Sequence, residues 1–251
     1  MKWLIALIVV VFFAGCATVY NPATGKKEAI FIGTDSENAI GNQTAAIIKS
    51  KYKFSVGKES IKHLSDIGAR VASVSDRQDL EYEFYLIDDE DLNAFAIPGG
   101  RIYMFRGLYE LLDDDEIACV LAHEVGHVAA RHVVKKLQTS LSYQILSTIA
   151  LSLYARGRED SAKYAGYIAY AASTSFNIVM SGYSREDEYQ ADFLAVKYSK
   201  LAGYDPEGMV GSLRKLDENK KKGIAVPYIL RSHPYISERI ERISLLLQDN
   251  V

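Results

Sequence analysis

The sequence predicts an α+β protein that is mainly helical and carries a small antiparallel sheet. Two observations lead to this class. Apolar residues recur at helical spacing over most of the chain, and three short strand-like runs follow one another between residues 82 and 105. Because helices come before and after these runs rather than alternating with them, the order favours α+β over a parallel α/β sheet.

Six elements are expected before residue 113. Two of them are strands joined through Pro98-Gly99-Gly100. They are helices Thr34–Lys51 and Lys58–Val74, strands Tyr82–Ile87, Ala94–Ile97 and Arg101–Phe105, and a short helix Gly107–Leu112.

The next helix is expected to start in the acidic run Asp113–Glu116. Negative side chains are favourable there because the amide dipoles of a helix point their positive ends toward its N-terminus. Ile117, Val120, Leu121 and Val125 then form an apolar stripe at helical spacing. This pattern predicts a helix with one face in the core.

The region 137–183 is expected to be mostly helical. Its stretches 137–155 and 164–184 contain no charged residue and are long enough to cross a membrane. They also contain many Ser, Thr, Gln, Asn and Tyr residues, which favours buried helices or a lid over an active site. Membrane insertion is the alternative.

Three signals mark the remaining helices. Ser184 can cap a helix that ends near Ala202, Asp205-Pro206 is typical of a helix start, and Pro234 begins a last helix to about Leu247.

The chain opens with a pattern typical of a targeting segment. Lys2 supplies a positive start, the run Trp3–Phe13 is apolar, and the tripeptide Ala14-Gly15-Cys16 follows. Small residues before a cysteine are typical of a bacterial lipoprotein signal, so we expect a lipid on Cys16. Ala17, in place of an aspartate, favours the outer membrane. Ordinary cleavage close to the tripeptide and an uncleaved anchor are the alternatives.

The expected organisation is therefore a signal peptide at 1–15, a lipidated N-terminus and tether at 16–33, and one domain at 34–251. Asn21–Gly25 is expected to form a turn within the tether. With a lipid on Cys16 the chain has one other cysteine, Cys119, so no internal disulfide can form and a buried core position is expected.

The charge pattern excludes one class of partner. The formal net charge is −3, and no basic run is longer than Lys220–Lys222, so nothing points to nucleic-acid binding.

The motif His123-Glu124-Val125-Gly126-His127 carries the chemistry. Residues four apart share a helix face, so His123 and His127 can bind one zinc ion, and Glu124 lies close enough to reach a water on that metal. A helix with two satisfied histidines is the alternative. His63 is expected at the surface or in helix packing. His132 is expected at the surface or in a capping role rather than as a ligand, because it lies five residues after His127 and points off the zinc face.

A catalytic zinc site needs a third protein ligand. Glu188 and Asp192 are four apart in an acidic segment, so one can bind metal while the other accepts the free N–H of a ligating histidine. Spacing leaves open whether Glu188 is the ligand, and an acidic solvated helix face is the alternative.

Four motifs in this order resemble the HtpX/BepA-type zinc metallopeptidases, the family that includes the CAAX prenyl proteases. The resemblance covers about residues 21–247. The motifs are Asn93–Gly100, His123–His132, Ser184–Asp192, and His233-Pro234 followed by Arg239.

This resemblance implies a zincin-like metallopeptidase domain with one zinc ion per chain. It implies that His123, His127 and Glu188 are the zinc ligands, Glu124 is the catalytic base, and Asp192 supports a ligand. It also implies that His233 and Arg239 contact the substrate or the oxyanion. The 94–105 hairpin, opened by Asn93, Ala94 and Phe95, could supply a sheet edge for an extended substrate. A purely structural hairpin is the alternative.

The expected function is a lipid-anchored zinc endopeptidase of unfolded or misfolded envelope proteins, at the periplasmic face of a bacterial outer membrane. Its chemistry would be hydrolysis by a metal-activated water with Glu124 as general base. The alternatives are a client-binding quality-control protein with little turnover and a membrane-embedded protease.

Overall fold

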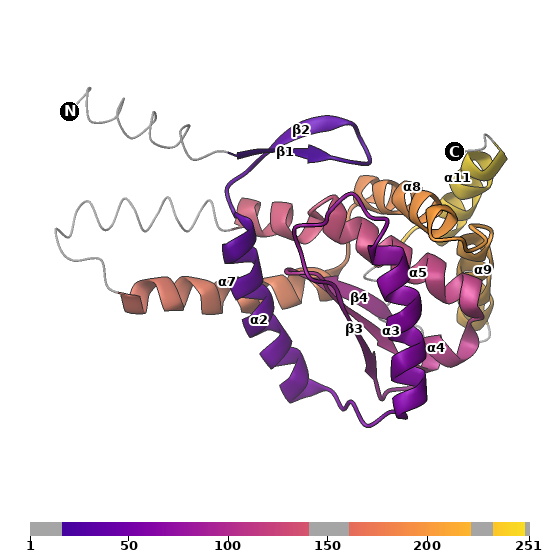
Figure 1. Ribbon diagram of the computed structural model, residues 1–251, viewed down its shortest axis with the longest axis horizontal. Coiled ribbons are helices and arrows are strands. Elements are labelled where there is room, and N and C mark those ends of the chain that lie inside the picture. The colour runs from indigo at the N-terminus through magenta and orange to yellow at the C-terminus, as the bar shows by residue number, and fades with distance from the viewer. Residues whose placement is uncertain (1–16, 141–160, 222–232, 249–251) are drawn as a thin grey trace.

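The computed structural model describes residues 17–140, 161–221 and 233–248, and it has the predicted α+β architecture with mostly helical content (Figure 1). The elements are β1 (Ala17–Asn21), β2 (Lys26–Ile30), α2 (Thr34–Lys51), α3 (Lys58–Ala72), β3 (Glu83–Ile87), β4 (Ala94–Ile97), β5 (Arg101–Phe105), α4 (Arg106–Leu111), α5 (Asp114–Ala129), α7 (Ser161–Ser181), α8 (Arg185–Leu201), α9 (Gly208–Lys221) and α11 (Ile236–Gln248).

The first two strands form a hairpin that the sequence analysis missed. β1 and β2 pair antiparallel, from Ala17 opposite Ile30 to Asn21 opposite Lys26. The turn expected at Asn21–Gly25 joins them, with Gly25 in the left-handed region at φ 68°. Residues 17–30 are therefore a folded hairpin rather than an extended tether.

The second sheet is mixed, and the expectation of an antiparallel sheet is wrong for one of its strands. The spatial order is β3-β5-β4, with β4 antiparallel and β3 parallel to β5. The segment 88–93 passes the end of β5. β4 therefore pairs with the edge of β5 opposite to β3, and β5 lies between the two. β5 is the buried central strand, with Ile102 and Met104 fully covered.

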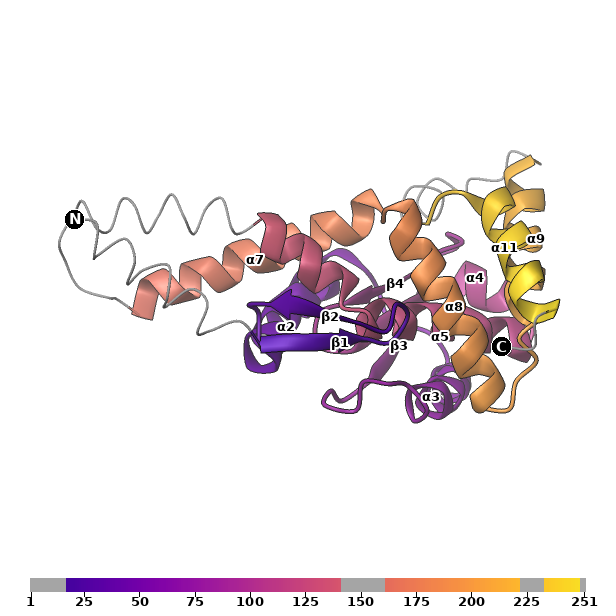
Figure 2. The same ribbon diagram turned by 90° about the horizontal axis from the view of Figure 1, so that it is seen from above.

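Helix α5 lies at the centre of the helical layer and packs against α3, α8, α9 and β4 (Figure 2). Its start has the predicted chemistry, because Asp113 accepts from the Glu116 amide while the Glu116 carboxylate accepts from the Asp113 amide. Such a capping box satisfies two amides that a helix start leaves free. Cys119 is fully buried on this helix, as expected.

Two helix starts differ from the expectation. α9 begins at Gly208 rather than at Pro206, because the amides of Gly208 and Met209 first close two tight turns onto the carbonyls of Asp205 and Pro206. α11 begins at Ile236 because Tyr235 has φ 68°, which a right-handed helix cannot contain.

Helix α7 extends to one side of the molecule (Figures 1 and 2). It confirms the helical character expected after residue 161, whereas residues 141–160 lie outside the described part of the chain. Among the described helices, none combines the length and the apolar character that crossing a bilayer requires.

Candidate metal centre

Helix α5 places three side chains of the motif in the interior. His123 is 3% exposed, and Glu124 and His127 are each 1% exposed. The Nε2 atoms of the two histidines lie 3.1 Å apart, as expected for residues one helical turn apart that point to the same side.

Helix α8 brings the predicted third ligand to the same point. Its start is fixed by Ser184, which caps the helix in a capping box with Asp187 as expected. One turn later Glu188 is fully buried, and its two carboxylate oxygens lie 3.5 Å from Nε2 of His123 and 3.5 Å from Nε2 of His127. The spacing argument left this register open, and the structure places Glu188 rather than Asp192 beside both imidazoles.

The two helices approach closely at Gly126, the glycine of the motif. A Cβ atom there would lie 3.1 Å from the carbonyl oxygen of Ala191 and 3.1 Å from Cβ of Leu194. A glycine therefore lets α8 lie near enough for Glu188 to meet the histidines of α5.

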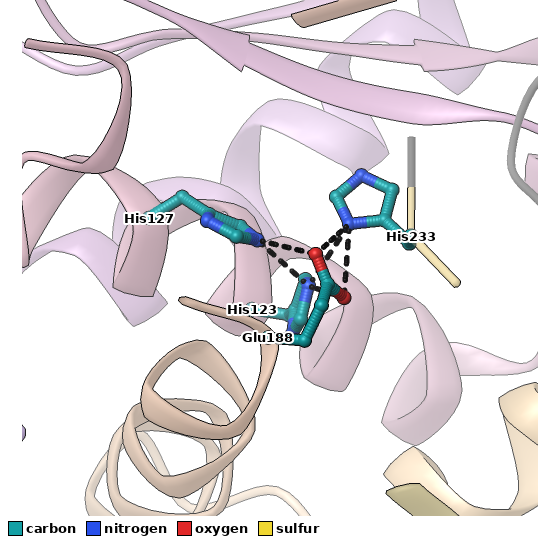
Figure 3. A group of neighbouring side chains, drawn as sticks. All are labelled: His123, His127, Glu188 and His233. Carbon is teal, nitrogen blue, oxygen red and sulfur yellow. Dashed lines mark hydrogen bonds and ion pairs between the residues drawn. The ribbon is translucent and has the colours of Figure 1, made fainter. Parts of the chain in front are cut away.

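His233 completes the group from the loop before α11 (Figure 3). Its Nδ1 lies 3.1 Å from Oε1 of Glu188 and 3.2 Å from Nε2 of His123. One donor atom from each of the four residues lies within 4.8 Å of the others. Four ligands about 2.0–2.1 Å from a tetrahedral zinc ion are about 3.3 Å apart, so the short contacts in this group have the right scale for such an ion.

Asp192 and Arg239 form the layer behind the donor atoms. Oδ1 of Asp192 lies 2.9 Å from Nδ1 of His123, the nitrogen on the far side of that ring. Arg239 donates from Nε and Nη2 to the two Asp192 oxygens, at 2.8 and 2.7 Å. Its Nη1 lies 2.9 Å from Glu188. Asp192 thus has the position from which a carboxylate orients a metal-binding imidazole.

These charges set the ionisation of the buried carboxylates. Burial acts to raise the pKa of Glu188, but the charges of His233 and Arg239 outweigh it and hold that pKa well below its usual range. For Asp192 the same burial is outweighed by Arg239 and His123, which lower its pKa. Both side chains are therefore anionic near neutral pH, as the binding of a cation requires.

The expectation for His132 is wrong. This residue is 1% exposed, and its Nδ1 lies 2.7 Å from Nδ1 of His127. Spacing failed because α5 ends at Ala129 and Arg131 has φ 56°, so the helical segment that begins at His132 runs in a new direction. His63, in contrast, is partly exposed and contacts Tyr109, in keeping with the expected packing role.

Tyr183 is a site residue that the sequence analysis did not select. Its ring stacks on His127 with centroids 3.8 Å apart, and its hydroxyl is buried without a hydrogen-bond partner among the described residues. Its position directly before the Ser184 cap was a signal that could have indicated it.

The residues expected to bind substrate are divided between two faces of β4. Ala94 lines a small pocket together with His123 and Glu124. The Phe95 side chain points into the core, where it stacks on Tyr103 with centroids 5.2 Å apart. The Phe95 side chain is therefore not available to a substrate. Asn93 is 1% exposed, and its carbonyl accepts from the amide of Phe105.

The sequence profile of peptidase family M48 matches residues 59–246. The chain belongs to this family. The match covers α5, α8 and α11 as far as residue 246, so every residue of the candidate metal centre lies within it, whereas the β1–β2 hairpin lies outside.

Curated relatives of this M48 chain include two groups of proteases. A beta-barrel assembly-enhancing protease of Yersinia pestis is 23% identical over 222 residues, which is 87% of this chain and 45% of that protein. Metalloprotease LoiP of Escherichia coli (strain K12) is 29% identical over 194 residues, covering 74% and 69% of the two chains. The M48 chain spans less than half the length of the beta-barrel assembly-enhancing protease it matches.

Proposed function

We propose that this M48 chain is a zinc-dependent endopeptidase of unfolded or misfolded cell-envelope proteins. The observation that carries the proposal is the position of Glu124 beside a buried group of metal-binding atoms. Its Oε1 lies 3.4 Å from Nε2 of His233, and its Oε2 has no hydrogen-bond partner among the described residues. A carboxylate with one oxygen left without a partner at such a place is available to move a proton.

The donor set favours zinc as the metal. His123, His127 and Glu188 supply two imidazoles and a carboxylate, a ligand set typical of catalytic zinc sites. These residues would hold the zinc ion, which when bound would lower the pKa of a water molecule to about 7 and polarise the scissile carbonyl. We propose one zinc ion per chain.

Four side chains would carry out the reaction around this ion. Glu124 takes a proton from the attacking water and later delivers it to the leaving amine. The Nε2 atom of His233 is buried and has no hydrogen-bond partner among the described residues, so it is free to donate to the developing oxyanion. Arg239 lines the same pocket and adds positive charge, while Asp192 holds His123.

The substrate would bind as an extended strand along β4. β4 is one of the two outer strands of its sheet, and in its register with β5 the carbonyl of Asn93 is turned inward to Phe105. Because backbone groups alternate along an antiparallel strand, those of Ala94 and Ala96 point outward, where a peptide could pair with them. Such main-chain recognition suits unfolded chains, in which extended segments are exposed.

A pocket next to Glu124 favours an apolar side chain at the cleavage site. Its lining combines the catalytic residues with apolar side chains from α5, α9 and α11, among them Val120, Met209, Leu213 and Ile236. Burial of an apolar side chain is favourable by about 1.5–3 kcal/mol, which would anchor the peptide next to the reacting bond.

Turnover of casein, an unfolded protein, tests the proposal. We expect cleavage that stops when a chelator removes the metal and returns when zinc is added. Binding of casein without cleavage under the same conditions would support the alternative, a client-binding protein with little turnover, and would contradict the peptidase.

The site of action remains a proposal based on the N-terminal sequence. We propose that lipid on Cys16 attaches the protein to the periplasmic face of the outer membrane. One acyl chain binds a membrane only marginally, whereas two or more give stable attachment. The Cys16→Ser variant should leave the membrane fraction or stay unprocessed. Mass spectrometry that finds an unmodified N-terminus at Ala17 would contradict lipidation, and solubility of residues 17–251 without detergent would contradict the membrane-embedded alternative.

A further inference from the structure

A chain of buried side chains connects the far side of His127 to the N-terminal hairpin. Nδ1 of His127 lies 2.7 Å from Nδ1 of His132, and Nε2 of His132 lies 3.2 Å from Oε1 of Gln190. The Asn21 side chain of β1 donates to the same Gln190 oxygen at 3.0 Å. Four residues from four separate segments thus form one line that ends at a proposed metal ligand.

The positions of the hydrogen atoms along this line are determined by which nitrogen of His127 faces the metal. A neutral imidazole carries one N–H. If Nε2 of His127 faces the metal, its Nδ1 must carry the hydrogen and donate to His132. The His132 hydrogen then lies on Nε2 and is donated to Gln190. The oxygen of Gln190 therefore fixes the tautomer of both rings.

Two neighbours hold the Gln190 amide in the orientation that this requires. Its nitrogen donates to Glu186 at 3.2 Å, which turns its oxygen toward His132. Asn21 donates to that oxygen, and an amide flipped by half a turn would set its own N–H groups against this donor. The hairpin thus specifies which end of the amide faces His132.

Asn21 is itself held in place within the hairpin. It is 2% exposed, donates to Glu28 at 2.8 Å, and accepts from the amide of Ala23 at 2.9 Å. Its side-chain oxygen and nitrogen are both engaged, so its donor direction toward Gln190 is set by the fold of β1 and β2.

Arg131 adopts an unfavourable left-handed backbone conformation that places His132 beside His127. A left-handed conformation is unfavourable for a residue other than glycine, and Arg131 has φ 56°. The Arg131 side chain is tied down by Glu37 at 3.2 Å and by Asp79 at 3.6 Å. Such backbone strain persists where surrounding contacts stabilise the strained residue. Here the left-handed conformation of Arg131 directs the chain so that His132 faces His127.

We propose that Asn21, Gln190 and His132 are positioning residues of the metal centre, through which the N-terminal hairpin fixes the tautomer and orientation of His127. This rests on the proposed function, in which His127 binds zinc. Asn21 lies outside residues 59–246 that the family profile matches, so the hairpin adds to the matched domain a support for its metal site.

Zinc affinity, measured by competition with a chromophoric chelator at fixed pH, tests the proposal. His132→Leu should weaken zinc binding about 10–100-fold, the usual loss when the hydrogen-bond partner of a metal-binding histidine is removed. Gln190→Met has similar size but no acceptor oxygen, and should weaken it about 3–10-fold.

Gln138→Met is the matched control. Gln138 also links the hairpin to the segment after Arg131, accepting from the Phe31 amide and donating to the Ala29 carbonyl, but it has no part in the line to His127. We expect native zinc affinity in this variant. The thermal midpoint of each metal-free variant shows whether it folds, and the half-buried Gln190 is a site where folding should survive.

Native zinc affinity in both His132→Leu and Gln190→Met would overturn the proposal, as would an equal loss in Gln138→Met. Failure of the proposed function would look different, because the native protein itself would then bind no zinc and His127→Ala would change nothing.

Discussion

Arg239 and Asp192 form a buried ion pair directly behind His123. Two N–H groups of the guanidinium meet the two oxygens of the carboxylate at 2.8 and 2.7 Å, and both residues are 2% exposed. The same carboxylate lies 2.9 Å from Nδ1 of His123. Helix α11 thus supports the metal-binding face of α5 through two carboxylates on α8, those of Asp192 and Glu188.

This pair changes what is expected of Arg239→Ala. The family resemblance implied only a contact of Arg239 with the substrate or the oxyanion. Because removal of Arg239 leaves the charges of Asp192 and Glu188 buried without their partner, we now expect the free energy of unfolding to fall by about 3–5 kcal/mol. Urea denaturation of the metal-free protein measures it. Arg242→Ala on the same helix is the control, since Arg242 is exposed, and should change stability by less than about 1 kcal/mol. Equal stability of the two variants would contradict a buried supporting pair.

Local chemistry made much of the centre predictable. A helix period places His123 and His127 on one side of α5, and the capping signals at Asp113 and Ser184 fix where α5 and α8 begin. With both starts fixed, Glu188 falls one turn into α8, but spacing did not decide between Glu188 and Asp192, and the family resemblance selected Glu188.

Long-range geometry was not predictable in the same way. The place of β3 depends on which edge of the 94–105 hairpin it joins, and spacing contains no information on that choice. His132 was misplaced because one left-handed residue, Arg131, redirects the chain. The hairpin at 17–30 was missed because its strands are short and half exposed, so their residues do not alternate clearly between apolar and polar.

The third ligand is tested by Glu188→Ala. Loss of a ligand should weaken zinc binding by more than about 100-fold, which exceeds the loss caused by removing a supporting residue. Metal analysis after dialysis should find zinc in the native protein and in Glu241→Ala, an exposed control on α11, but not in Glu188→Ala. Full zinc in Glu188→Ala would show that the assignment to α8 is wrong.

His233 is tested by kinetics on a short fluorogenic peptide. Three ligands remain in His233→Ala, so zinc should be retained, while loss of a donor to the oxyanion should lower kcat about 10²–10³-fold and raise KM less. His63→Ala, a partly exposed histidine, should leave both constants unchanged.

The Nδ1 atom of His233 also belongs to the group of four donors. A rise in kcat would therefore contradict the oxyanion role and show that His233 closes the site as a fourth ligand.

The most direct test of the central claim compares zinc content and casein turnover in the native protein and in Glu124→Gln. The glutamine keeps the size of the side chain and removes the base. The account predicts about one zinc ion per chain in both proteins and turnover at least about 10²-fold lower in the variant. Near-native turnover by Glu124→Gln with its zinc in place would contradict it.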